Sequence, residues 1–144
     1  MCAADRCQCY GKNWTCPPAC GTIEEATLRA DPYRPGIIVQ SVGQLEDDFD
    51  FESMEATAEL HRQRFQKLVD GLKKEWPAML PMGAGACTPC ERCTYPDEPC
   101  RFPDEAIPSM EAYGLFVSQV CTASGMDYNH GKLTVTYTSC ILLA

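Results

Sequence analysis

At 144 residues the chain has the length of one domain, and its 45% hydrophobic and 22% charged residues are ordinary for a globular protein. The formal net charge of −8, with twelve scattered Lys and Arg residues, argues against a nucleic-acid partner, because phosphate binding needs clustered positive charge. No stretch approaches the roughly 18 consecutive apolar residues of a membrane span, so the sequence predicts no membrane association.

Eleven cysteines are the unusual feature of the composition. The N-terminus lacks a basic start followed by an apolar stretch, so no secretory signal is recognised and we expect a cytoplasmic protein. In a reducing compartment cysteines are more often metal ligands or redox groups than disulfides, and the odd count agrees with that. They gather within residues 2–20 and 87–100, with two more near the C-terminus. We therefore expect two ligand loops on one scaffold.

The first cysteine group occupies residues 2–20. Pro17 and Pro18 follow Cys16 directly, which removes two backbone donors and keeps that segment rigid, as is common beside cluster ligands. Trp14 either shields a cluster from water or anchors this loop in the core. The five cysteines of the group are Cys2, Cys7, Cys9, Cys16 and Cys20.

A cysteine-free segment follows and predicts a strand and then a helix. Residues 36–42 are rich in β-branched side chains, which is typical of a buried strand. The acidic run 46–52 is interpreted as a solvated turn, with a docking patch for a basic partner as the alternative. Apolar residues then recur at helical spacing from Ser53, a candidate N-cap, to the Trp-Pro pair at 76–77. His61 falls on the apolar face, where we expect a packed, hydrogen-bonded histidine in preference to a metal ligand.

The strongest motif of the chain is a run of closely spaced cysteines. Cys87, Cys90 and Cys93 are separated by two-residue gaps, and Cys100 follows after a longer one. Three thiolates on one tight turn match three corners of a cubane iron-sulfur cluster, and the fourth cysteine completes it. Four thiolates also suit a single zinc ion, although structural zinc sites usually pair two separated CxxC turns. We predict a 4Fe-4S cluster in the loop 87–101, with zinc as the alternative.

Arg101 follows the fourth cysteine of this motif directly. It either forms a salt bridge with Glu98, Asp104 or Glu105, or compensates the negative charge of the cluster. If Arg101 compensates the cluster charge, it contacts the cofactor. The same holds for Trp14 if it shields a cluster.

The rest of the chain predicts further elements of a small α+β fold. Residues 79–86 form a short strand or extended segment ahead of the cysteine loop. A helical region over 109–125, interrupted by a glycine, carries Cys121 as a buried free thiol. Alternating side chains over 133–141 indicate a strand with one buried face, which includes Cys140. We therefore expect residues 1–144 to form a single iron-sulfur domain, a small mixed β-sheet with two covering helices and two cysteine-rich loops.

Three stretches of the chain together resemble a known family: residues 2–21, the loop 87–101 and residues 108–114, Pro-Ser-Met-Glu-Ala-Tyr-Gly. Over nearly its whole length the chain is similar to small cysteine-rich proteins of mostly anaerobic bacteria and archaea, which are predicted metal-binding, iron-sulfur proteins of unknown function. The resemblance implies metal binding and no particular reaction.

The same resemblance implies a ligand set in the first loop. The matching ligands are Cys2, Cys7 and Cys16, whereas Cys9 and Cys20 fall where other residues are usual in the family. Three ligands imply a second cluster with one iron left open.

Three functions suit these ligands. The first is an electron-transfer or redox accessory module with one or two 4Fe-4S clusters, whose acidic surface selects a redox partner protein. The second is an enzyme in which the open iron acts as a Lewis acid or in sulfur transfer. The third is a structural zinc protein whose folding is linked to the metal. For the enzyme, the candidate substrate contacts are Tyr10, Lys12, Asn13, Glu111 and Tyr113.

Overall fold

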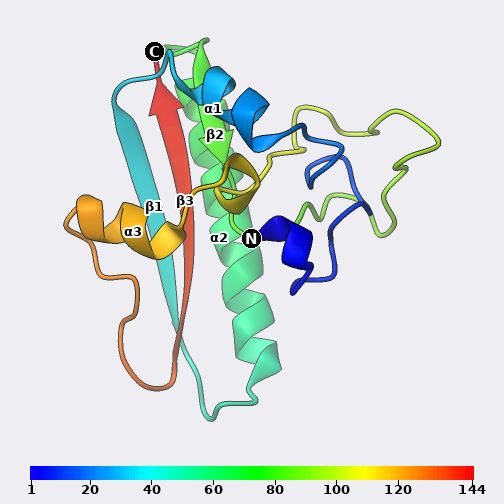
Figure 1. Ribbon diagram of the computed structural model, residues 1–144. Coiled ribbons are helices and arrows are strands. Elements are labelled where there is room, and N and C mark those ends of the chain that lie inside the picture. Colours follow the sequence, from blue (N-terminus) through cyan, green and yellow to red (C-terminus); the bar gives the residue numbers. More distant parts are fainter.

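The computed structural model describes residues 1–144 and contains one antiparallel sheet with helices on both faces (Figure 1). The α+β class is thereby confirmed, with three α-helices and with strands that are all antiparallel. The strands are β1 (Gly36–Gln44), β2 (Met79–Met82) and β3 (Thr134–Leu143). The helices are α1 (Ile23–Ala30), α2 (Phe51–Leu72) and α3 (Val117–Ala123), with short 3-10 turns η1 (Cys2–Ala4) and η2 (Glu111–Tyr113).

The strand β3 lies in the centre of the sheet, in the order β1-β3-β2. It pairs with β1 along its length, from Thr134 opposite Gln44 to Leu142 opposite Gly36, and β2 covers only its C-terminal end. Residues 138–141 are buried without alternation, so the expectation of a single buried face is wrong for this half of the strand. The reason is that both faces of the central strand are covered.

Helix α2 covers one face of the sheet. It begins after Asp50, whose side chain accepts a hydrogen bond from Ser53 N at 3.0 Å, so the cap lies three residues before the predicted one. His61, Phe65 and Val69, four residues apart, are its buried side chains and lie on one face of the helix. Phe65 and Val69 pack with two side chains of β3, Ile141 and Leu143.

His61 is a core residue, as expected. Its side chain is 3% exposed, and its two ring nitrogens lie 2.9 Å from Ser41 Oγ and 2.8 Å from Ser139 Oγ. Burial lowers the pKa of His61, and the nearby Arg64 charge lowers it further, so the ring is neutral near pH 7.

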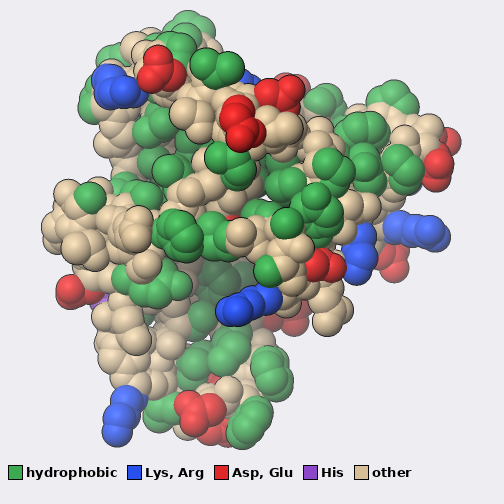
Figure 2. Space-filling model, in the orientation of Figure 1, with side chains coloured by type: hydrophobic (Ala, Val, Ile, Leu, Met, Phe, Trp, Pro, Cys, Tyr) green, Lys and Arg blue, Asp and Glu red, His purple; other side chains and the backbone are tan.

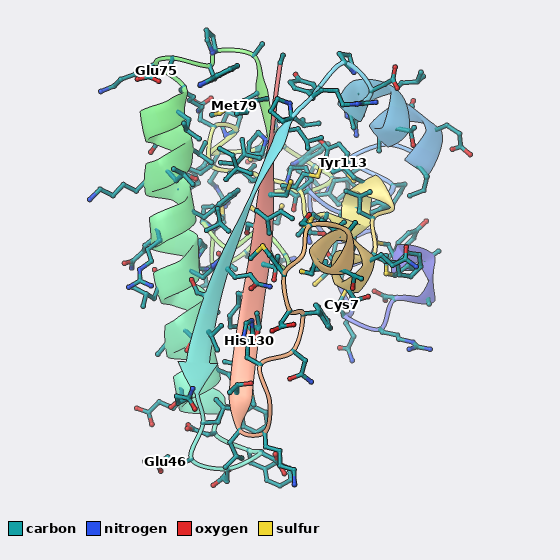
Figure 3. The ribbon with its side chains drawn as sticks, turned by 90° about the vertical axis from the view of Figure 1, so that its left-hand side faces the viewer. Cys7, Glu46, Glu75, Met79, Tyr113 and His130 are labelled. Carbon is teal, nitrogen blue, oxygen red and sulfur yellow. The ribbon has the colours of Figure 1, made fainter.

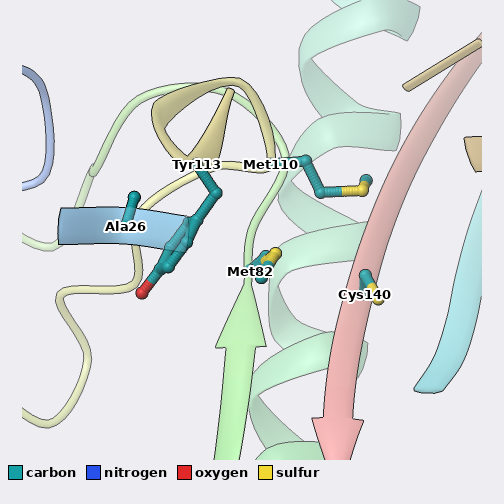
Figure 4. Packing of buried hydrophobic residues seen from close by; sticks show 5 residues of the cluster. All are labelled: Ala26, Met82, Met110, Tyr113 and Cys140. Atoms are coloured by element: carbon teal, nitrogen blue, oxygen red, sulfur yellow. The ribbon is translucent and has the colours of Figure 1, made fainter. Parts of the chain in front are cut away.

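The opposite face of the sheet is covered by α1, η2 and α3. In Figure 3 these elements lie to the right of the sheet, and α2 lies to its left. Sequence reasoning did not predict α1, although Thr22 and Glu25 form a capping box at its start. A second core cluster lies on this side (Figure 4): Ala26, Met82, Met110, Tyr113 and Cys140. Cys140 is therefore a packed core residue.

The two cysteine loops lie side by side, away from β1 (Figure 1). Apart from η1 they contain only turns and bends. The base of the second loop is closed where Gly83 N donates to Pro108 O at 2.8 Å. On the face drawn in Figure 2 the Lys and Arg side chains are scattered and form no patch. None of the helices combines the length and the apolar character that crossing a membrane requires.

Candidate metal centre

Trp14 holds the two cysteine loops together. Its indole Nε1 donates to Thr94 Oγ1 at 3.3 Å and to the Glu98 carbonyl at 3.1 Å. Its ring meets Tyr95 edge to face, with centroids 4.9 Å apart. All three partners belong to the second loop, so Trp14 anchors the first loop to the second and not to the core of the sheet.

The four cysteines of the second loop line one cavity of about 290 Å³. Cys87, Cys90, Cys93 and Cys100 all contribute to its wall, so the structure brings the predicted ligands together. Cys9 and Trp14 of the first loop line the same cavity, which therefore lies between the two loops. The residues lining this space include five cysteines, whose thiols are soft ligands suited to zinc or iron.

The sulfur atoms of this loop influence one another. Burial, more than any other cause, raises the pKa of Cys87 to about 11. The sulfurs of Cys100, Cys93 and Cys90 act in the same direction, while a hydrogen bond with the Thr15 side chain lowers this pKa. The Cys87 thiol is thus protonated at neutral pH, and binding a metal through it releases a proton.

The spacing that the thiolates need depends on the metal that they bind. No group of three or more His, Cys, Asp or Glu side chains is placed so that it could hold one metal ion. In a tetrahedral zinc site with bonds of about 2.3 Å, the sulfur atoms lie roughly 3.8 Å apart. In a cubane each cysteine binds a different iron, which spaces the sulfurs more widely.

The three predicted ligands of the first loop also lie near one another. Burial raises the pKa of Cys16, while a hydrogen bond with Asn13 lowers it. The nearby sulfurs of Cys7, Cys20 and Cys2 raise the same pKa. Burial and then the Cys7 sulfur raise the pKa of Cys2. Cys7 itself is exposed.

Cys2 is attached to the sheet side of the molecule. Its Sγ lies 3.5 Å from the carbonyl oxygen of Glu111, to which it donates, so η1 is held against η2. Glu111 thus contacts the first cysteine loop through its backbone carbonyl.

Sequence reasoning left Cys9 and Cys20 without a role, and the structure places both near predicted ligands. Burial and then the Cys7 sulfur raise the pKa of Cys9. Burial is the main cause that raises the pKa of Cys20, and the Cys2 sulfur adds to it. The spacing of Cys16 and Cys20, one helical turn, was the signal that could have drawn attention to the second of these residues.

Arg101 braces the second loop. Its guanidinium donates to the Arg92 carbonyl at 2.8 Å and so links the two ends of the segment 92–101. The ion pairs of the structure are Arg34 with Asp31 and Arg62 with Glu59, so the alternative of a salt bridge from Arg101 is not seen. Its contact with a cofactor stays a prediction, as it does for Trp14.

The polar side chains predicted as substrate contacts differ in their burial and in the cavities that they line. Asn13 is 8% exposed and its Oδ1 accepts from Thr15, while Tyr113 packs in the core. Lys12 lines the cavity of the second loop. Tyr10 is 38% exposed.

A larger cavity, of about 860 Å³, lies between α2 and residues 83–89. Its lining includes His61, Arg62 and Ser139, and Arg62 donates to the Thr88 hydroxyl across it. Cys87 lines this cavity as well as the smaller one. One predicted ligand thus borders both spaces.

The comparisons with known proteins agree with metal binding. A family model described as "Predicted metal-binding protein (DUF2284)" matches residues 1–143. No curated protein and no solved structure matches the chain.

Proposed function

We propose that this chain, which belongs to the family of predicted metal-binding proteins (DUF2284), is an iron-sulfur protein that acts as an electron-transfer or redox accessory module. The observation that carries this proposal is the cavity whose wall contains all four cysteines of the second loop, Cys87, Cys90, Cys93 and Cys100.

The size of this cavity favours a polynuclear cluster over a lone ion. Its volume of about 290 Å³ is many times the roughly 10–15 Å³ of cavity space that holds one water molecule. A lone zinc ion bound to four sulfurs needs no such space, because the sulfurs close directly around it. A cubane of four irons and four sulfides does need it, and its ligands are thiolates.

The closeness of the two loops favours electron transfer. Thr15 lies beside Cys87 of the second loop, whose pKa its side chain lowers, and it directly precedes Cys16 of the first. Consecutive Cα atoms are about 3.8 Å apart, so the Cys16 Cα lies within about 10 Å of the Cys87 sulfur. Clusters in the two loops would therefore be near neighbours.

A bound 4Fe-4S cluster supplies one-electron exchange, and the chain supplies its surroundings. Cys87, Cys90, Cys93 and Cys100 would hold the cluster of the second loop. The Thr15 side chain lies beside Cys87 and lowers the pKa of its thiol. Trp14 forms part of the wall and excludes water from it. The net charge of −8 suits a basic redox partner protein.

Purification without oxygen tests the proposal directly. We expect iron and acid-labile sulfide in equal amounts, and a paramagnetic resonance signal that appears on reduction with dithionite and disappears on reoxidation. Cys90→Ser should remove the cluster of the second loop, whereas Cys121→Ala, at a buried cysteine of α3, should leave iron and sulfide unchanged. A colourless protein with stoichiometric zinc and no sulfide would contradict the proposal and favour the structural zinc site.

An enzyme is the second candidate, and the cavity of about 860 Å³ favours it. This volume lies in the range of small-molecule sites. Cys87 lines both cavities and so lies between this one and the proposed cluster. Ala58→Phe, which narrows this cavity, separates the two functions. If small organic acids or thiols perturb the spectrum of the reduced wild type and not that of the variant, the cavity binds substrate. A pure electron-transfer module shows no such effect.

A further inference from the structure

Five cysteines lie in the first loop, and three of them account for the ligands that family resemblance implies. Building on the proposed function, we infer that Cys20 is the fourth ligand of the cluster held by Cys2, Cys7 and Cys16. The first loop then carries a cubane with all four irons bound to cysteine, and no iron is left open for substrate.

The backbone between Cys16 and Cys20 forms one helical turn. Cys20 N donates to Cys16 O at 3.2 Å, and Gly21 N donates to Pro18 O at 3.0 Å. Residues four apart on such a turn have side chains on the same side, so both thiols face one region. Gly21, with φ of 101°, ends the turn in a conformation that favours glycine.

The sulfur of Cys20 is near two of the three other ligands. The Cys20 sulfur is close enough to those of Cys16 and Cys2 for their charges to act on one another. Cys2 is fixed in turn by its contact with the Glu111 carbonyl. The first loop therefore wraps around so that its two ends approach each other.

Arg29 supplies a positive charge at this place. Its guanidinium donates to the Cys20 carbonyl at 2.8 Å and lies 5.5 Å from the centre of the Tyr113 ring. Both contacts hold the charge beside Cys20, where it would offset the negative charge of a bound cluster.

Cys9 is the competitor for the fourth position. Like Cys20, it lies near two predicted ligands, Cys7 and Cys16, but it also borders the second loop. Its Sγ donates to the Cys7 carbonyl at 3.3 Å, and the residue lines the cavity of the second loop. Cys9 therefore faces the other proposed cluster, which already has four cysteines.

A matched pair of variants, Cys20→Ser and Cys9→Ser, tests the inference after anaerobic reconstitution with iron and sulfide. The wild type should hold about eight irons per chain, four for each cubane. Mild treatment with ferricyanide should release one Fe²⁺ from the first cluster of Cys20→Ser, because the iron at that corner has lost its thiolate. The cubane core in its 2+ state becomes a three-iron core in its 1+ state, and ferricyanide takes up the one electron. The paramagnetic signal of an oxidised three-iron cluster should appear in this variant alone, while Cys9→Ser should match the wild type.

A second variant keeps the test independent of folding. Cys20→Ala treated with Fe²⁺, dithionite and 2-mercaptoethanol should regain the fourth iron and lose the three-iron signal. Dithionite supplies the one electron, and the free thiol fills the vacant corner.

The possible results separate the inference from the function on which it rests. If Cys20→Ser keeps its iron and gives no three-iron signal, or if Cys9→Ser gives that signal, the inference is overturned and the iron-sulfur function stands. If the wild type binds neither iron nor sulfide, the function itself is wrong and the inference is lost with it.

Discussion

Trp14 is the residue that most directly joins the two cysteine loops, and its role is testable. Trp14→Phe keeps the ring against Tyr95 and removes the donor to Thr94 and Glu98. We expect the loaded protein to lose about 1 kcal/mol of stability toward urea and to lose its cluster to a chelator several-fold faster. Trp76→Phe, at a 37% exposed position beyond α2, is the matched control. Equal rates of cluster loss in the two variants would contradict the linking role.

His61 makes stability depend on pH in a direction that its surroundings determine. Its pKa is lowered in the folded state, first by burial and then by Arg64, from an ordinary value of 6.5. Above pH 6.5 the ring is neutral in both states and pH has no effect through it. As the pH falls below 6.5, the unfolded chain takes up a proton that the folded protein does not, so folding loses stability.

The measurement for His61 is the urea midpoint between pH 5.5 and 7.5. The wild type should weaken toward acid, and His61→Gln, which still offers hydrogen bonds to Ser41 and Ser139, should weaken less steeply whatever its absolute stability. Parallel curves for the two proteins would contradict the assignment.

At the scale of elements, the contact between β1 and α2 depends on the absence of one side chain. A Cβ at Gly43 would overlap Thr57 Oγ1 and come within 3.0 Å of Thr57 Cβ. Gly43→Ala should therefore lower the free energy of unfolding by about 1–3 kcal/mol. Gly71→Ala in α2 meets open space and should raise it by up to about 1 kcal/mol. Urea unfolding of both variants checks the pair, and a stabilised Gly43→Ala would show that the contact is loose.

The elements that local patterns determine could be predicted. The spacing of apolar residues predicts α2, and β-branched and alternating runs predict β1 and β3. The cap of α2 was misplaced because Asp50 and Ser53 are both good capping residues, and the contacts of the folded loop favour Asp50. The short helix α1 has only eight residues and one buried side chain, so its periodicity carries little signal.

The candidate site also has one part that local sequence patterns predict and another part that they do not. The CxxCxxC spacing is local, and it predicts that Cys87, Cys90 and Cys93 share a cavity. The contact of Trp14 with Glu98 joins positions 84 residues apart, and that of Cys2 with Glu111 joins positions 109 apart. No local pattern encodes such contacts, so the approach of the two loops could not be predicted from the sequence.

At the scale of the whole molecule, the layered core is stabilised by apolar packing, whereas the two cysteine loops lack such a packed cluster of their own. The sheet and α2 have their own buried cluster, whereas residues 1–22 and 83–105 contain almost no regular structure. If metal organises the loops, its removal should leave the core folded. We expect amides of α2 and β3 to stay protected from hydrogen exchange in the metal-free protein, while those of the two loops exchange within seconds.

The comparison for this prediction is the loaded protein, in which the loop amides should be protected as well. Loss of protection in α2 and β3 on metal removal would mean that the two parts unfold together and that the core depends on the metal.

The central position of β3 has a consequence for biosynthesis. Both cysteine loops leave the ribosome before β3, yet β1 and β2 have no contact in the sheet until β3 enters between them. At about 5–20 residues per second, the thiols up to Cys100 wait a few seconds on a nascent chain whose scaffold is still open. Delivery of a metal to the thiols would thus have a time window during translation, which ends when β3 inserts.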